Sequence, residues 1–139
     1  MKKWVIIGIC MLIVSALVWG SIYLSRTAQY RRIISEITIP SIDLSTISDG
    51  VYEGSFDAIM VAAEVNVQIE DHRITDIVLV SHKNDRGAPA VVIIGKIVDM
   101  QSLNVDTISG ATNSSKVILK AIENALESAL EEVHESTNP

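Results

Sequence analysis

A stretch of hydroxyl and turn-forming residues leads directly into a helical sequence pattern near the carboxyl end of the chain. It runs from Asp106 to Ser115 and reads Asp-Thr-Ile-Ser-Gly-Ala-Thr-Asn-Ser-Ser. Ser114 or Asn113 can cap the first turn of the helix that follows. The unpaired N–H groups of such a turn, together with the helix dipole, favour a bound anion such as a phosphate. The other interpretation is an ordinary capped helix with a polar face.

The charges of this helix run against the direction that its dipole favours. Lys116 and Lys120 lie near the amino end, whereas Glu131, Glu132 and Glu135 lie near the carboxyl end. Basic residues at an amino end are mildly unfavourable. They become favourable if a phosphate binds there, so the charge pattern supports an anion site.

The elements that must position these residues form a small α+β fold. A short strand over 51–56, strict alternation of apolar and polar residues over 61–70, and a β-rich run over 74–80 predict three antiparallel strands, the last two as a hairpin. Residues 89–100 combine an early proline with helical apolar spacing at Val91, Ile94 and Val98, which predicts a helix.

The last element is a long amphipathic helix. Its polar face carries Lys116, Lys120, Glu123, Glu127 and Glu131, and its apolar stripe should pack on the sheet. The fold class is therefore a small antiparallel sheet packed against two helices. The stripe consists of Val117, Ile118, Ala121, Ile122, Ala125, Leu126, Ala129, Leu130 and Val133.

The amino terminus has the composition of a membrane segment. Trp4 to Leu24 is 21 residues without a charge, and at about 1.5 Å per residue it reaches about 30 Å, the thickness of a hydrocarbon core. Trp19 and Tyr23 suit an interfacial belt. We expect residues 1–25 to form one transmembrane helix, with a secretory signal that is cleaved as the alternative.

Three regions follow from this pattern. Residues 26–48, which mix Arg, Ser, Thr and Pro40 without a period, are interpreted as a juxtamembrane stalk between the anchor and a folded domain at 49–135. A Met-Lys-Lys start followed by an apolar run resembles a bacterial export signal. We therefore expect a cytoplasmic amino terminus and a domain outside the cell membrane.

Composition excludes several classes of protein. The 139 residues carry a formal charge of −6, and removing residues 1–25 leaves 9 basic and 17 acidic residues, a charge of −8. Such an acidic remainder argues against nucleic acid as a partner, because nucleic-acid affinity comes largely from Lys and Arg. One Cys excludes an internal disulfide, and no Cys/His spacing fits structural zinc.

The motif Asp106, Thr107-Ile108, Ser109, Gly110, Ala111, Thr112 resembles the signature of the FMN-binding domain family. These small domains occur in extracytoplasmic flavoproteins and in flavin subunits of membrane ion-pumping redox complexes. Their signature is an Asp, a short spacer, Ser or Thr, Gly, Ala, and a Thr whose hydroxyl carries FMN through a phosphoester bond. The resemblance covers about 85 residues, from the Asp49-Gly50 opening to the Ala-rich helix.

The resemblance implies that Thr112 is the covalent acceptor of FMN. Gly110 would permit a turn or a close approach that a Cβ obstructs, and Ala111 would keep the site uncrowded. Asp106 would be part of what a flavin transferase recognises, the alternative being a plain helix-cap Asp. The other candidate cofactor-binding residues of the motif and the helix start are Ser109, Asn113, Ser114 and Lys116.

The loop over 81–87 resembles a loop that lies near the flavin in short members of the family. Lys83 and Arg86 would face the phosphate or the flavin ring, where a positive charge stabilises the reduced, anionic form. His82 belongs to the same loop, although it fits a surface histidine better than a proton donor. The alternative is a solvated exit from the hairpin.

The resemblance implies a membrane-anchored carrier that relays electrons outside the cytoplasmic membrane, between a donor and an acceptor that the sequence does not identify. Nothing in the sequence resembles a substrate pocket with an acid/base pair, which favours a carrier over an enzyme with its own turnover. Two other classes fit the same residues. One is an anchored non-redox module for a phosphate-bearing ligand, and the other is an accessory subunit of a membrane redox complex.

Overall fold

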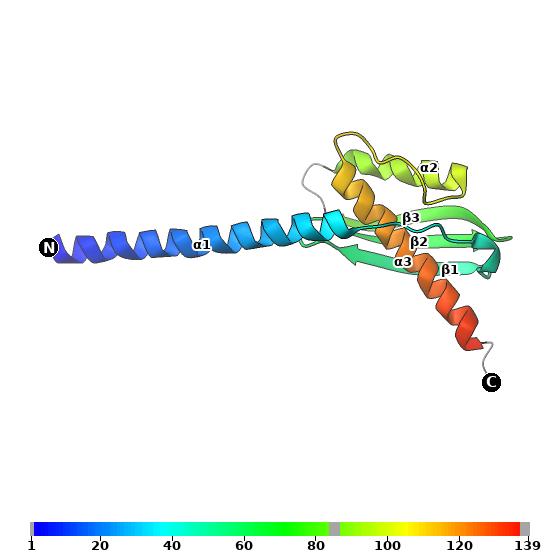
Figure 1. Cartoon of the computed structure of the whole chain (residues 1–139), viewed down its shortest axis with the longest axis horizontal. Coiled ribbons are helices and arrows are strands. Elements are labelled where there is room, and N and C mark those ends of the chain that lie inside the picture. The colour runs from blue at the N-terminus through cyan, green and yellow to red at the C-terminus, as the bar shows by residue number, and fades with distance from the viewer. Residues whose placement is uncertain (1, 84–86, 137–139) are drawn as a thin grey trace.

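A computed structural model describes residues 2–83 and 87–136, with side chains considered up to residue 131 (Figure 1). A long helix projects from an α+β domain in which three strands lie beside two further helices. The α+β prediction is thus confirmed. The elements are α1 (Lys2–Glu36), the 3₁₀ turn η1 (Leu44–Thr46), β1 (Gly50–Asp57), β2 (Ala62–Glu70), β3 (Arg73–Lys83), the 3₁₀ turn η2 (Ala88–Val92), α2 (Ile93–Met100) and α3 (Thr112–Ser136).

The three strands form an antiparallel meander in the order β1–β2–β3. Tyr52 of β1 pairs with Val67 of β2, which in turn pairs with Ile77 of β3. The apolar residues of the alternating segment 61–70 point to one side of this sheet. Ala63, Val65, Val67 and Ile69 are all buried there. The predicted hairpin is therefore confirmed, and period-two patterning fixes its buried face.

Helix α3 crosses that buried face and contacts β1 and β2. Gly54 makes the close packing possible: a Cβ placed there would clash with the carbonyl oxygen of Ala121 and lie 2.7 Å from the Cβ of Ala125. The predicted stripe is buried as far as it is described. Val117, Ile118, Ala121, Ile122, Ala125, Leu126 and Ala129 are buried and Leu130 is half-buried, whereas Val133 lies outside the described side chains.

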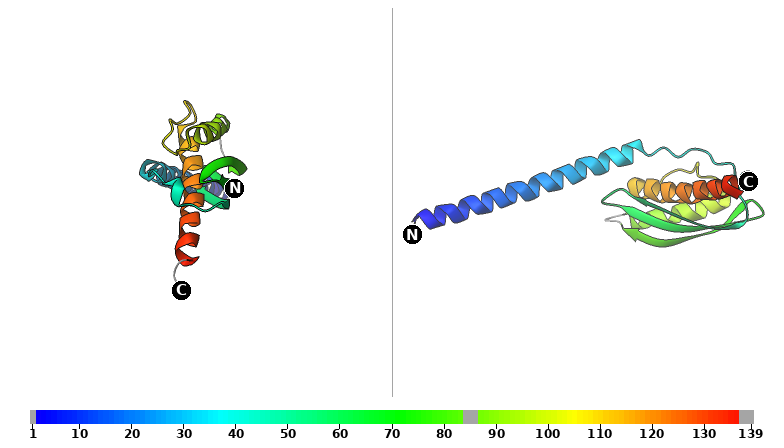
Figure 2. Two further views of the ribbon diagram at one scale, coloured as in Figure 1. Left: turned by 90° about the vertical axis from the view of Figure 1, so that its right-hand side faces the viewer. Right: turned by 90° about the horizontal axis from the view of Figure 1, so that it is seen from below.

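The polar face of α3 differs from the prediction at Glu123, which is only 2% exposed. The segment that follows α1 runs along the side of α3 opposite the sheet (Figure 2). Ile37, Ile39 and Ile42 of this segment pack against the core. The helix is therefore covered on two sides, which its amphipathic pattern alone does not indicate.

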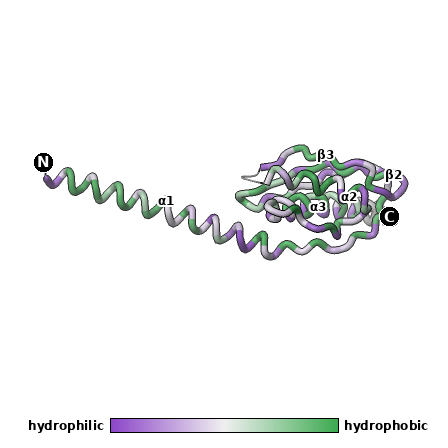
Figure 3. The backbone as a smooth tube through the Cα atoms, turned by 90° about the horizontal axis from the view of Figure 1, so that it is seen from above, coloured by the Kyte–Doolittle hydropathy of each residue, from purple (hydrophilic) through white to green (hydrophobic). Residues whose placement is uncertain are grey.

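Helix α1 continues without a break through the first half of the predicted stalk. Its last turns are attached to the domain, since Ile34 is buried and Tyr30 and Ile33 pack against the core. The hydrophobic part of α1 extends away from the domain and gives way to polar residues before reaching it (Figure 3). By length and composition, α1 is able to cross a membrane. The region boundaries at 25 and 48 stay predictions.

The segment 89–100, predicted as one helix, forms a 3₁₀ turn followed by a shorter α-helix, and the residues that it buries differ from the predicted ones. Residues 88–92 form a 3₁₀ turn and α2 begins at Ile93. The buried residues are Ala90, Ile93 and Ile97, whereas Val91 is exposed. Gln101 ends α2 in a left-handed conformation, and its side-chain amide bonds both the N–H and the C=O of Ile74. These bonds fix the end of α2 to β3.

Candidate functional site

The motif before α3 folds into a tight turn. Gly110 has a φ of +79°, and the N–H of Ala111 donates to the carbonyl oxygen of Ile108 at 2.9 Å. A positive φ at the third residue of such a turn favours glycine. A Cβ on Gly110 would meet nothing within 4 Å. The glycine therefore serves the conformation of the turn rather than a close approach within the protein.

Ser115 holds this turn against the helix, a role that our sequence analysis missed. It is fully buried, and its Oγ accepts from the N–H of Ile108 at 3.1 Å and donates to the carbonyl oxygen of Ala111 at 2.9 Å. A hydroxyl four residues after the Ala of the motif, within the first helical turn, is the signal that could have identified it.

Helix α3 begins at Thr112, two residues before the start expected from a cap at Asn113 and three before that expected from a cap at Ser114. The prediction that Asn113 or Ser114 precedes and caps the helix is therefore wrong, because both lie inside its first turn. The first intrahelical bond of this region joins the N–H of Ser115 to Ala111 at 2.9 Å. The N–H groups of the preceding helical residues have no acceptor within the helix. This end of α3 therefore has the polarity that suits an anion.

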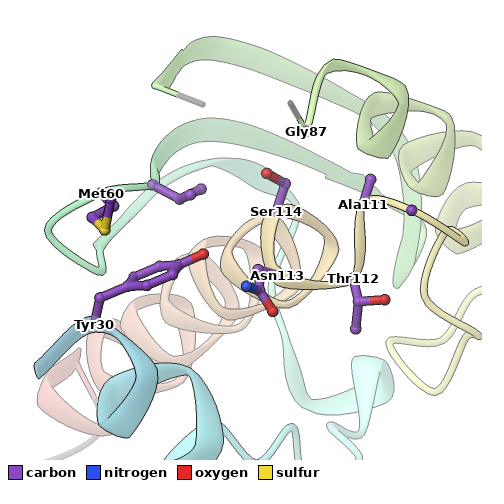
Figure 4. Close-up of a pocket in the computed structure, with 9 residues that line it drawn as sticks. Tyr30, Met60, Gly87, Ala111, Thr112, Asn113 and Ser114 are labelled. Carbon is purple, nitrogen blue, oxygen red and sulfur yellow. The ribbon is translucent and has the colours of Figure 1, made fainter. Parts of the chain in front are cut away.

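A cavity of about 490 Å³ lies at this helix start (Figure 4). Its volume is within the range of small-molecule and cofactor sites. Thr112 lies at one end, and Tyr30 of α1 and Met60 of the β1–β2 turn lie at the other. The lining residues are Tyr30, Met60, Val61, Gly87, Gly110, Ala111, Thr112, Asn113 and Ser114.

The structure brings half of the predicted site residues together. Five of them, Gly110 to Ser114, line the cavity, with Thr112 and Asn113 exposed and Ala111 and Ser114 buried. Asp106 and Ser109 are exposed on the preceding loop and do not line it. Their predicted roles remain untested by this geometry.

The two lysines of α3 have partners within the protein. Lys116 Nζ donates to the carbonyl oxygen of Ile34 at 3.3 Å, and Lys120 Nζ pairs with Glu123 Oε1 at 2.8 Å. The carboxyl end of α1 and a buried carboxylate thus account for positive charges at the start of α3. The positive charges at this end of α3 therefore do not by themselves indicate a bound phosphate. The role of Lys116 in cofactor binding stays a prediction.

His82 and Lys83 belong to the end of β3 and not to a loop, as the prediction had it. Lys83 Nζ donates to the carbonyl oxygen of Ile59 at 2.8 Å, which places its charge beside the β1–β2 turn. Burial lowers the pKa of His82 below its ordinary value, so its imidazole is neutral at pH 7. Arg86, which we predicted to face the flavin, lies outside the described residues.

Four lining residues were not among the named candidate residues: Tyr30, Met60, Val61 and Gly87, the last of which ends the loop over 81–87 that we predicted to lie near the flavin. Tyr30 is the only aromatic residue between 26 and 48, which is the signal that could have singled it out. The others come from turns and strand ends whose positions depend on tertiary packing. Among the described residues, no group of three or more His, Cys, Asp or Glu side chains could hold a metal ion.

Comparison with known proteins gives one family match. Residues 60–127 match the model of the FMN-binding domain. This range begins at the β1–β2 turn and includes the whole motif and most of α3. It therefore contains every residue of the cavity except Tyr30.

Two relatives are similar to part of the chain. An uncharacterized protein of Treponema pallidum (strain Nichols) is 33% identical over 84 residues, which is 58% of this chain and 23% of that protein. An NADH:acrylate oxidoreductase of Vibrio harveyi is 43% identical over 68 residues, which is 47% of this chain and 7% of that protein. The chain thus spans less than a quarter of the length of either relative.

Proposed function

Because residues 60–127 of this chain match the FMN-binding domain family, we propose that the protein is a membrane-anchored flavoprotein that relays electrons at the outer surface of the cytoplasmic membrane. The observation that carries the proposal is the cavity at the start of α3, which the motif residues line together with the end of α1. One helix thus serves as anchor and as part of the site.

The cavity has the chemistry that FMN requires. Its end at Thr112 offers the N–H groups and positive dipole of a helix start, which suit a phosphate. Gly110 adds no side chain there, and Ala111 adds only a methyl group. Its other end is formed by Tyr30 and Met60, an aromatic and a thioether side chain that suit a flat ring. The residues present therefore fit the cofactor.

Thr112 is the proposed point of covalent attachment. Its side chain is exposed at the first residue of α3 and on the wall of the cavity, so its hydroxyl is accessible to a transferase. In the proposed step, the transferase moves the FMN group of a flavin dinucleotide to Thr112 Oγ. A phosphoester bond forms, the phosphoanhydride bond breaks, and the hydroxyl proton leaves with the nucleoside monophosphate. The protein gains the mass of FMN less one water.

Electron relay is the proposed role of the attached cofactor. FMN accepts two electrons and can release them singly, and the protein contributes tethering and the environment of the ring. The Vibrio relative is named for oxidoreduction, and this chain matches only 7% of it. We therefore propose that the chain carries electrons for a separate donor and acceptor. The amino terminus of α1 lies on the cytoplasmic side in this arrangement, and the domain lies outside.

The test is the intact mass of the denatured full-length protein. The protein is purified in detergent from an export-competent host that also expresses an active flavin transferase. We expect a mass increase of one FMN less water, located in the peptide that contains Thr112. Thr112→Ala abolishes the increase, whereas Thr75→Ala, an exposed threonine of β3, retains it.

Two other results distinguish the alternatives. Yellow colour that is lost on denaturation, without a mass increase, indicates a module that binds a phosphate-bearing ligand non-covalently. A colourless, unmodified protein, with the transferase shown to modify another substrate, indicates an accessory subunit without flavin. Either result contradicts the covalent carrier.

A further inference from the structure

Tyr30 reaches the cavity from the helix that contains the predicted membrane anchor. Its ring projects from α1 toward Asn113, and it is the residue of α1 that lines the cavity (Figure 4). Its position is fixed one turn further along α1. There Ile34 is buried, and its carbonyl oxygen accepts the bond from Lys116. The end of α1 is therefore a wall of the cavity and not a loose connection to the domain.

Met60 forms the neighbouring wall from the turn between β1 and β2. Ile59 of this turn has a φ of +73°, a region that β-branched residues rarely adopt. Three bonds hold the conformation: Ala58 N–H to Val61 C=O at 2.8 Å, Ile59 N–H to Asp57 Oδ1 at 2.6 Å, and Lys83 Nζ to Ile59 C=O at 2.8 Å. The surrounding bonds thus determine the turn that presents Met60.

The cavity therefore has two chemically different ends. Thr112 and the helix start form a polar end, whereas Tyr30 and Met60 form an aromatic and apolar end. FMN has the same division, with a phosphate at one end and a flat aromatic ring at the other. We propose that Tyr30 stacks on the flavin ring, so that the anchor helix itself is part of the flavin site. This inference rests on the proposed function and adds a residue outside the matched range 60–127.

The position of Tyr30 also sets the height of the ring above the membrane. Tyr30 lies six positions after Leu24, the last apolar residue of the uncharged segment. In a continuous helix this distance is about 9 Å, and α1 is continuous through Glu36. The ring is therefore held close to the membrane surface, at a height that a flexible stalk would not fix.

Fluorescence of the attached flavin tests the stacking. A phenol in contact with an excited flavin transfers an electron to it, and the electron then returns, so the fluorescence is quenched without net reaction. A phenyl ring is a much weaker donor. Tyr30→Phe retains the ring and the packing of α1, and we expect it to lengthen the fluorescence lifetime several-fold. Tyr23→Phe is the matched control, because Tyr23 is exposed on the same helix and does not line the cavity.

The mass of each protein is measured before its fluorescence. If wild type and both variants carry equal FMN and have the same lifetime, Tyr30 does not contact the ring and the inference is wrong, while the proposed function stands. If the wild type carries no FMN although the transferase is active, the proposed function and this inference both fail. A longer lifetime in Tyr30→Phe alone, at equal FMN content, supports the stacking.

Discussion

Lys116 and Ile34 lie 82 positions apart in the sequence, and the ammonium group of the first donates to the carbonyl oxygen of the second. This bond joins the amino-terminal part of α3 to the last turn of α1. It places a cation at the carboxyl end of α1, where the helix dipole favours one. The two helices that contribute the ends of the cavity are thus connected directly.

The first prediction concerns Lys116→Met. The substitution removes a bond worth about 1 kcal/mol and keeps most of the aliphatic contact. If Lys116 serves α1, hydrogen exchange at residues 30–36 should accelerate while FMN content stays at the wild-type level. A fall in FMN content with unchanged hydrogen exchange would instead indicate that Lys116 contacts the phosphate of FMN. Intact mass and exchange mass spectrometry on the same sample decide between the two roles.

The second prediction concerns Ser115→Ala. It leaves the N–H of Ile108 without its acceptor in the turn, which should lower the free energy of unfolding by about 1–3 kcal/mol. We also expect less FMN attachment at limiting transferase, because the turn before Thr112 loosens. Ser128→Ala is the control, since Ser128 bonds only locally to Ala125 within the same helix. Equal FMN attachment in both variants would show that the conformation of this turn does not affect attachment at Thr112.

Local patterns in the sequence predicted what depends on near neighbours. Alternation identified the buried face of β2, and the motif identified a turn with glycine at the position of positive φ. Both features are decided within a few residues, by side-chain periodicity and by the conformational freedom of Gly110.

The same sequence did not predict what depends on docking between distant segments. Tyr30 and Met60 approach Thr112 only because α1 and the β1–β2 turn pack at the start of α3. Glu123 fits a solvated face by its spacing, yet it is buried in the folded chain. Lys116 gave a misleading signal for the same reason, because its partner is the carbonyl oxygen of Ile34 on α1.

The third prediction concerns the close approach of β1 and α3. Gly54→Ala places a Cβ against the backbone of Ala121 and Ala125, so the strand or the helix must shift. We expect a loss of about 3 kcal/mol in the free energy of unfolding. Gly95→Ala is the control, since a Cβ there meets nothing within 4 Å, and alanine in a helix stabilises by about 0.5–1 kcal/mol. Chemical unfolding of both variants should therefore give changes of opposite sign.

The fourth prediction concerns pH. Because burial lowers the pKa of His82 in the folded protein, the unfolded chain binds a proton at a higher pH than the folded chain does. The free energy of unfolding should therefore fall as the pH drops through about 6.5, the ordinary pKa of histidine. The loss is complete below the folded pKa. His82→Gln should flatten this dependence, and an unchanged slope between pH 7.5 and 5 would exclude His82 as its source.

The fifth prediction concerns the ion pair between Lys120 and Glu123 on α3. Glu123 is buried, whereas the side chain of Lys120 is 24% exposed. Removing only the cation leaves a buried carboxylate without its partner, so Lys120→Met should destabilise the protein by about 3 kcal/mol. The double variant Lys120→Met/Glu123→Leu replaces both charges with apolar side chains and should recover most of this loss.

The comparison of the single and double variants separates two explanations for the pair. If the carboxylate is tolerated only because Lys120 neutralises it, the double variant unfolds near the wild-type denaturant concentration. If Glu123 also holds the covering segment in place, the double variant stays destabilised and hydrogen exchange at residues 37–42 remains fast. Since that segment continues directly from α1, the second outcome would make Glu123 part of what fixes the end of α1 beside the cavity.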